Sequence, residues 1–167
     1  MLWLRQQGHA VLGVELSPIA VRDFFAENGL ALTHASAGQF DRCEADGIRI
    51  LCGDFFELTR EHLAQVRAVY DRASLVALPP EMRARYARHL AELLPSGTQV
   101  LLVTFDYPQD EMNGPPFAVS VDEVRALYGA YAEVRLLAQV DILEREPRFK
   151  ARGVTRMQEN IFLLTMK

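Results

Sequence analysis

The order of hydrophobic and polar positions along the chain switches repeatedly between two periods. Short apolar runs bounded by Gly, Pro or Asp are typical of buried strands, and they alternate with segments whose apolar residues recur at helical spacing. This alternation predicts an α/β fold, with a mostly parallel sheet covered by helices on both faces.

The first part of the chain contains four strand-like runs. We predict strands at 10–16, 47–52, 68–70 and 99–105. The last of these is apolar nearly throughout, which indicates a central strand buried on both faces. The polar segment 33–46 is expected to be a loop with a short edge strand.

Helices are predicted between these strands. Ser17 is a good N-cap for a helix that starts at Pro18 and stops at Asn28–Gly29, with Ala20, Phe24 and Phe25 as its apolar stripe. Further helices are expected from Thr59 to Val66, from Pro80, and from Ser120, where Ser120 and Glu123 form a capping box. In the helix that starts at Pro80 the apolar face is Met82, Tyr86, Leu90 and Leu93, and the solvated side is Arg83, Arg85 and Arg88.

The end of the chain has a different pattern. The strand-like runs 134–143 and 157–166 have only the charged link 144–155 between them, which predicts an antiparallel hairpin. The preceding loop, 107–117, is rich in helix and strand breakers.

Composition limits the protein class. A length of 167 residues suits a single domain, 1–167, and 50% apolar with 24% charged residues is typical of a soluble globular protein. A net charge of −4 without basic runs argues against nucleic acid as a partner, and no apolar run is long enough to cross a membrane. Two cysteines and four scattered histidines predict neither a disulfide framework nor a metal site. Cysteine use this sparse suits a cytoplasmic protein, in which both thiols stay reduced.

Charged residues follow several predicted strands. In open α/β sheets ligands bind beyond the carboxyl ends of the strands. The residues at these ends are Glu15, Asp54, Asp71, Arg72, and Asp106 with Tyr107.

Two of these acids have a specific role available. Glu15 can accept hydrogen bonds from both hydroxyls of a ribose, or it is simply a solvated acid near a helix N-terminus. Asp54 can accept a hydrogen bond from an adenine amine beside Phe55 or Phe56, or it starts a turn whose phenylalanines belong to the core.

Arg72 is the candidate cation. It can bind a carboxylate or stabilise charge on a substrate, or it forms a structural ion pair with Asp71. The loop 113–117 either covers this cleft or is a connection without function.

Six segments together resemble the thiopurine S-methyltransferase family of class I S-adenosylmethionine-dependent methyltransferases, and the bacterial branch in particular. They are GHAVLGVELS (8–17), LCGDFFEL (51–58), YDRASLVALPP (70–80), LLVTFDYPQDEMNGPPF (101–117), VDILEREPRFKARG (140–153) and IFLLTMK (161–167).

The resemblance implies a Rossmann-like fold with a C-terminal antiparallel hairpin, and it implies S-adenosylmethionine as cofactor. Glu15 would bind the ribose, and Gly53, Asp54 and Phe55 would line the adenine. Arg72 would lie near both cofactor and substrate. A second substrate arginine would be Arg145, and Pro115 and Phe117 would wall the substrate pocket.

The implied activity is methyl transfer to the sulfur of an aromatic or heterocyclic thiol by a cytoplasmic monomer. Other acceptors stay open: selenium or tellurium species, halide, or a small thiol. A nicotinamide-dependent oxidoreductase and a non-catalytic interaction domain are the alternatives from other classes.

No glycine-rich turn precedes Glu15. The family has more chain before this point, and residue 1 falls where the family has the helix after its first strand, with Leu2, Trp3 and Leu4 as the last apolar stripe and Gly8 as the stop. We therefore expect a shortened N-terminus that lacks the strand between 10–16 and 68–70, and little or no cofactor affinity for the chain as it stands.

Overall fold

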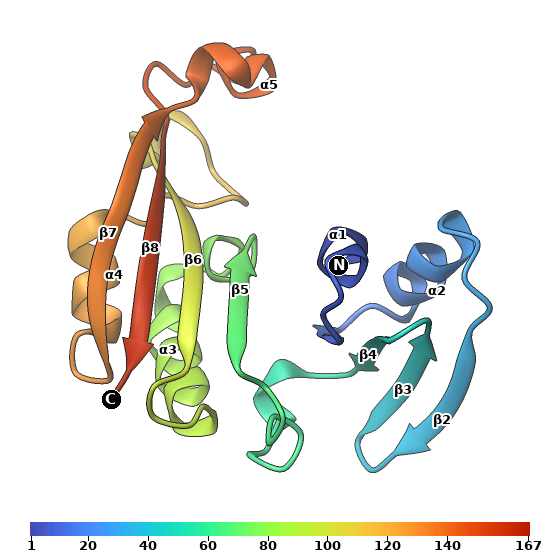
Figure 1. Ribbon diagram of the computed structural model, residues 1–167. Coiled ribbons are helices and arrows are strands. Elements are labelled where there is room, and N and C mark those ends of the chain that lie inside the picture. Colours follow the sequence, from blue (N-terminus) through green and yellow to red (C-terminus); the bar gives the residue numbers. More distant parts are fainter. The chain divides into compact units, whose positions relative to one another are not determined.

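The computed structural model describes the backbone of residues 1–167 and every side chain except that of Ala37. The backbone divides into two compact units, Met1–Leu58 and Thr59–Lys167, and each is described by itself below (Figure 1). The single domain over 1–167 that the sequence suggested stays a prediction.

The first unit contains one four-stranded sheet. Its elements are α1 (Leu2–Gln6), β1 (Val11–Glu15), α2 (Pro18–Glu27), β2 (Thr33–Ala37), β3 (Phe40–Ala45), β4 (Ile48–Cys52) and the short 3₁₀ helix η1 (Phe55–Glu57). The strand order is β1-β4-β3-β2, in which β1 pairs with β4 in parallel and the other pairs are antiparallel.

Helix α2 forms where the sequence predicts it. The Ser17 hydroxyl accepts a hydrogen bond from the Ala20 amide, and Pro18 occupies the first turn. The helix ends before Gly29, whose φ of +64° suits glycine. Val21 and Phe25 form the buried face and pack on the sheet residues Cys43, Ile48 and Ile50, whereas Ala20 is exposed.

The segment 33–46, predicted as a loop with a short edge strand, forms the hairpin β2–β3. The edge strand is confirmed as β2, which ends the strand order, whereas the loop is wrong because β3 occupies its place. In β3 the buried positions include Phe40, Cys43 and Ala45, while Asp41 and Arg42 face solvent. The exposed Asp41 and Arg42 separate the buried positions, so the strand shows no regular apolar alternation in the sequence. This hairpin makes the first sheet mixed rather than mostly parallel.

The second unit contains the other four-stranded sheet. Its elements are β5 (Ala68–Arg72), η2 (Leu75–Ala77), α3 (Pro80–Leu93), β6 (Gln99–Asp106), η3 (Gln109–Glu111), α4 (Val121–Tyr128), β7 (Ala132–Asp141), η4 (Leu143–Arg145), α5 (Pro147–Lys150) and β8 (Gln158–Met166). The order is β5-β6-β8-β7. Only β5 and β6 are parallel, and the predicted antiparallel hairpin is confirmed as β7–β8.

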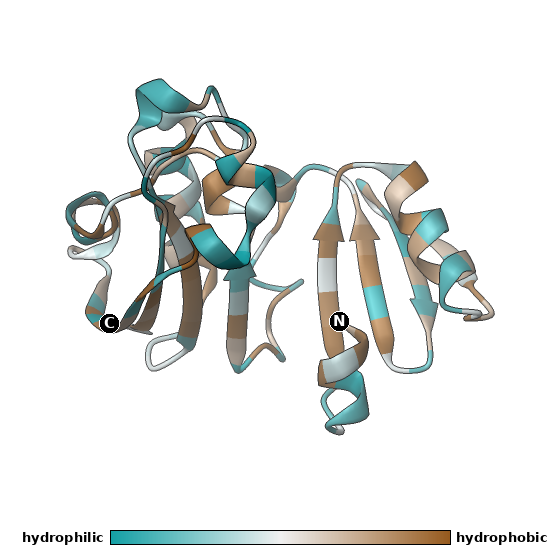
Figure 2. Ribbon diagram, turned by 90° about the horizontal axis from the view of Figure 1, so that it is seen from above, coloured by the Kyte–Doolittle hydropathy of each residue, from teal (hydrophilic) through white to brown (hydrophobic). Residues whose placement is uncertain are grey.

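Helices α3 and α4 lie on one face of this second sheet (Figure 1). Tyr86 and Leu90 of α3 are buried against it, and apolar residues predominate along its strands (Figure 2). On the opposite face Tyr70 is 55% and Leu101 38% exposed. The expectation that 99–105 is buried on both faces is therefore wrong for Leu101.

Two further expectations differ from the structure. Segment 59–66 forms successive turns instead of a helix. Their hydrogen bonds join residues three positions apart: the His62 amide donates to the Thr59 carbonyl, and the Leu63 amide donates to the Arg60 carbonyl. Arg83 is buried inside the unit, although Arg85 and Arg88 are exposed as predicted. Among the described residues no helix is long and apolar enough to cross a membrane.

Candidate functional site

Two carboxylates lie at adjacent strand ends in the first unit. Glu15 ends β1 and pairs in register with Cys52 of the parallel strand β4. The Gly53 amide then donates to the Glu15 carbonyl over 2.9 Å, so Gly53 and Asp54 follow directly beside Glu15. The sequence placed both acids at the carboxyl ends of predicted strands, and in the structure these two strand ends are adjacent.

Both carboxylates are held by the backbone that follows them. Glu15 Oε1 accepts the Ser17 amide at 2.8 Å, and Asp54 Oδ1 accepts the Phe56 amide at 2.9 Å. For the second oxygen of each group, no hydrogen bond is found within the part of the chain that the structure describes. Two fixed carboxylates that can accept further hydrogen bonds suit a ligand with hydroxyl or amine donors.

Gly53 has a structural reason to be glycine. A Cβ at this position would lie 2.6 Å from the ring of Phe40, which is buried in the same unit. Phe55 and Phe56 follow in η1, half-buried, with their rings edge to face at 5.7 Å between centroids.

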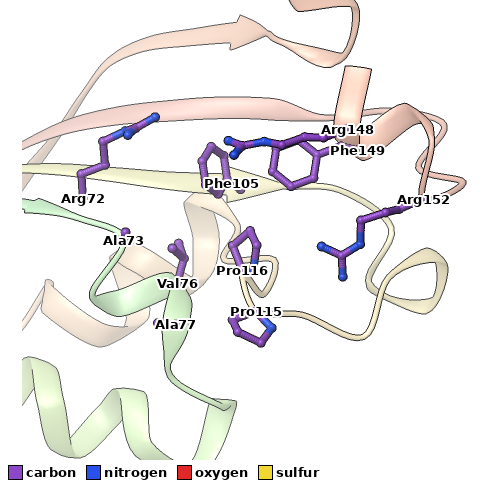
Figure 3. Close-up of a pocket in the computed structure, with 10 residues that line it drawn as sticks. All are labelled: Arg72, Ala73, Val76, Ala77, Phe105, Pro115, Pro116, Arg148, Phe149 and Arg152. Carbon is purple, nitrogen blue, oxygen red and sulfur yellow. The ribbon is translucent and has the colours of Figure 1, made fainter. Parts of the chain in front are cut away.

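The second unit contains a pocket of about 440 Å³ at the carboxyl ends of β5 and β6 (Figure 3). This volume is within the range of small-molecule sites. Three guanidinium groups and an apolar wall line it: Arg72, Ala73, Val76, Ala77, Phe105, Pro115, Pro116, Arg148, Phe149 and Arg152.

Arg72 and Asp71 do not pair with each other. Successive side chains of β5 point to opposite faces of the sheet. Arg72 therefore lines the pocket, whereas Asp71 is buried on the face that α3 covers. Arg72 lies 3.8 Å from the Glu159 carboxylate on β8. Asp71 accepts a hydrogen bond from the Tyr86 hydroxyl at 2.9 Å, and its burial raises the pKa of the carboxyl group despite that bond.

The turn after Arg72 brings the chain back along the pocket. Ala73 has a φ of +74°, a left-handed conformation that is uncommon outside glycine. Asp71 Oδ1 then accepts the Leu75 amide at 3.4 Å, which ties the turn to the strand below it.

The proline-rich loop forms a second wall. Pro115 and Pro116 line the pocket, and the Tyr107 hydroxyl donates to the Pro116 carbonyl at 2.6 Å. Phe117 is not among the lining residues. Its amide bonds the Val76 carbonyl at 2.7 Å and its ring lies 5.7 Å from the guanidinium of Arg83, so it braces the loop from behind.

The charged link supplies the third wall, through different residues than the sequence suggested. Arg145 lies exposed in η4 and does not line the pocket, whereas Arg148 and Arg152 do. The spacing of four between these two arginines is the signal that was missed, because a helical turn places such positions on one side. Phe149 between them is buried and its ring is 6.1 Å from that of Phe105.

A family model described as thiopurine S-methyltransferase (TPMT) matches residues 1–167. The chain belongs to the thiopurine S-methyltransferase family. This family uses S-adenosyl-L-methionine.

Among its members, the thiopurine S-methyltransferase of Nitrosospira multiformis is 61% identical over 164 residues, which are 98% of this chain and 74% of the relative. That of Methylococcus capsulatus is 47% identical over 98% of this chain and 74% of the relative. The chain thus spans about three quarters of the length of these relatives.

The chain has the class I methyltransferase-like α/β fold, because its backbone matches solved structures of that fold. A SAM-dependent methyltransferase from Methanosarcina mazei matches with a TM-score of 0.63 at 14% identity, covering 98% of this chain and 85% of that one. The 1,6-didemethyltoxoflavin-N1-methyltransferase of Burkholderia thailandensis matches with a TM-score of 0.59 at 15% identity, covering 99% and 65%. Identities this low bear on the fold alone.

Proposed function

We propose that the chain transfers the methyl group of S-adenosylmethionine to the sulfur of an aromatic or heterocyclic thiol. The observation that carries this proposal is the 61% identity to a thiopurine S-methyltransferase along 98% of the chain. The pocket of the second unit supports it, because its apolar walls suit a flat ring and its guanidinium groups suit an acceptor that ionises.

The residues of the first unit fit the cofactor. Glu15 can accept hydrogen bonds from the ribose hydroxyls, and Asp54 can accept one from the adenine amine. Gly53 and Phe55 lie beside Asp54 along the chain and would border the base. When bound, S-adenosylmethionine supplies a methyl group already activated by the positive charge of its sulfonium sulfur.

The second unit supplies the acceptor side. Arg72 would favour the thiolate form of the acceptor by lowering the pKa of its thiol. Phe105 and Phe149 would hold the ring while Pro115 excludes water. Positioning and desolvation then account for most of the rate. The geometry favours Arg148 over Arg145 as the second substrate arginine, and it gives Phe117 a supporting role behind Pro116.

A protein nucleophile is not required. Burial raises the pKa of both the Cys43 and the Cys52 thiols, so neither is an activated thiolate. Methyl transfer directly to the bound acceptor is consistent with this.

A radiolabelled methyl-transfer panel tests the proposal. Thiopurines, thiophenol, selenite and iodide are compared as acceptors at the same S-adenosylmethionine concentration. Thiols should be the best acceptors. Arg72→Ala should lower catalytic efficiency at least about a hundredfold, whereas Arg88→Ala, an exposed arginine on α3, should not. Unchanged efficiency in Arg72→Ala would sink the assignment of Arg72.

The cofactor is tested separately from turnover. S-adenosylhomocysteine should raise the melting temperature and NAD should not, and Glu15→Gln should weaken the S-adenosylhomocysteine effect. The reverse preference would favour the oxidoreductase class instead. Sedimentation in the same buffer tests the predicted monomer.

A further inference from the structure

The acceptor pocket has an excess of positive charge. It is lined by the guanidinium groups of Arg72, Arg148 and Arg152, and no carboxylate is among the described residues that line it. A neutral thiopurine or thiophenol needs at most one of these charges near its sulfur. Resting on the proposed function, we infer that the preferred acceptor is an aromatic thiol that also carries a carboxylate, and that Arg152 binds this carboxylate.

Two of the three arginines already have acidic neighbours. Arg72 lies 3.8 Å from Glu159, and Arg148 Nε lies 3.0 Å from Glu146 Oε2. For Arg152, the described part of the chain offers no side-chain hydrogen bond or ion pair. Figure 3 shows its side chain extending toward Pro115 and Pro116, into the pocket. Arg152 is therefore the cation that a ligand can pair without displacing a protein carboxylate.

The backbone at Arg152 is fixed before any ligand arrives. The Arg152 amide donates to the Phe149 carbonyl at 3.0 Å, and the Val154 amide donates to the same carbonyl at 3.2 Å. Phe149 itself is 3% exposed and anchors the segment in the second unit. Because the main chain is ordered, binding an anion at Arg152 costs mainly the freedom of one side chain.

The apolar wall fixes where such an anion lies. An aromatic ring held by Phe105 and Phe149 is flanked by guanidinium groups from opposite ends of the pocket, Arg72 on β5 and Arg152 on the link (Figure 3). A thiolate at the Arg72 end leaves a substituent on the far side of the ring within the reach of Arg152. A carboxylate fits there because a planar guanidinium can bind both of its oxygens.

The test compares 3-mercaptobenzoate with its neutral methyl ester, which keeps the ring and the thiol. The wild-type protein should prefer the acid by about tenfold in kcat/KM, as expected for one charge-assisted, solvent-accessible contact. Arg152→Gln should remove this preference through KM for the acid and change the ester less than about twofold. Arg88→Gln removes the same charge from exposed α3 and should keep the preference.

Equal loss for acid and ester in Arg152→Gln, or no acid preference in the wild type, overturns the inference. Calorimetric binding of 3-(methylthio)benzoate and its methyl ester, without cofactor, separates this failure from failure of the proposed function. Acid-selective binding that depends on Arg152, without methyl transfer to either thiol, upholds the anion site and refutes the activity. Methyl transfer to both thiols without selective binding upholds the activity and refutes the anion site.

Discussion

Glu111 accepts two hydrogen bonds from Thr155, one from the amide to Oε2 at 2.8 Å and one from the hydroxyl to Oε1 at 2.7 Å. This pair joins the loop after β6 to the end of the link that carries Arg148 and Arg152. Because both segments line the pocket, the pair fixes the distance between two of its walls.

Removing this connection should affect acceptor binding more than the chemical step. We expect Glu111→Ala to raise KM for the acceptor about threefold to tenfold with a smaller change in kcat, since the link would sample more arrangements. Steady-state kinetics with Asp110→Ala as the control checks this, because Asp110 is the exposed neighbour on the same loop. A similar KM in wild type and Glu111→Ala would contradict the expectation.

Arg83 should be important for stability. Its Nη1 donates to Glu123 Oε1 at 2.6 Å and its Nε to the Leu78 carbonyl at 3.0 Å, and the residue is 2% exposed. Arg83→Ala should lower the free energy of unfolding by about 2–4 kcal/mol, because it leaves a partly buried carboxylate and a carbonyl without a partner. Urea unfolding measures this.

The control for that measurement is on the same helix. Arg88→Ala should change the free energy of unfolding by no more than about 0.5 kcal/mol, because Arg88 is exposed. Equal effects of the two substitutions would show that the buried contacts of Arg83 contribute nothing.

The buried carboxyl of Asp71 should make stability depend on pH. Burial raises its pKa above the ordinary 3.8, so the folded protein holds this proton more tightly than the unfolded chain. The resulting stabilisation is complete below pH 3.8 and is lost as the pH rises through the folded pKa. Since asparagine does not titrate, Asp71→Asn should gain stability relative to wild type as the pH rises from 3.8 through the folded pKa of Asp71.

Urea unfolding of wild type and Asp71→Asn across this range gives the difference directly, and Asp110→Asn serves as the exposed control. A difference that is constant or that falls with rising pH would show that Asp71 is not destabilised as an anion.

Ala73 should be a position where glycine stabilises. Its φ of +74° costs about 1 kcal/mol or more for alanine. Glycine avoids this strain, but part of the gain is offset because glycine loses more conformational entropy on folding. We expect Ala73→Gly to raise the free energy of unfolding by up to about 1 kcal/mol. Ala84→Gly, in the exposed face of α3, should lower it by about the same amount. Thermal unfolding that gives both substitutions the same sign would contradict this.

Local signals in the sequence predicted much of this structure. Ser17 and Pro18 fix the start of α2, and the apolar run 99–105 predicts β6, because in each case neighbouring residues determine the local conformation. The sequence also placed Glu15 and Asp54 at the carboxyl ends of strands, and the parallel pairing brings these ends to one edge.

Features that depend on distant partners were missed. Arg83 looked like a solvated helix residue, and only Glu123, forty positions later, explains its burial. The strand β3 has polar, exposed residues between its buried positions, so its pattern resembles that of a loop, and only its pairing with β2 and β4 reveals it as a strand. Arg148 and Arg152 face the pocket because Phe149 docks on Phe105, which the link alone does not indicate.

The strand β8 comes after β5, β6 and β7 in the chain, yet it lies between β6 and β7 in the sheet. During synthesis β6 and β7 are therefore made before the strand that pairs with both of them. Until β8 is made, the backbone N–H and C=O groups on those edges of β6 and β7 have no strand partner. Aggregation of nascent or refolding chains should accordingly be most severe just before β8 is inserted, and substitutions in β8 should affect the yield of protein more than its intrinsic activity.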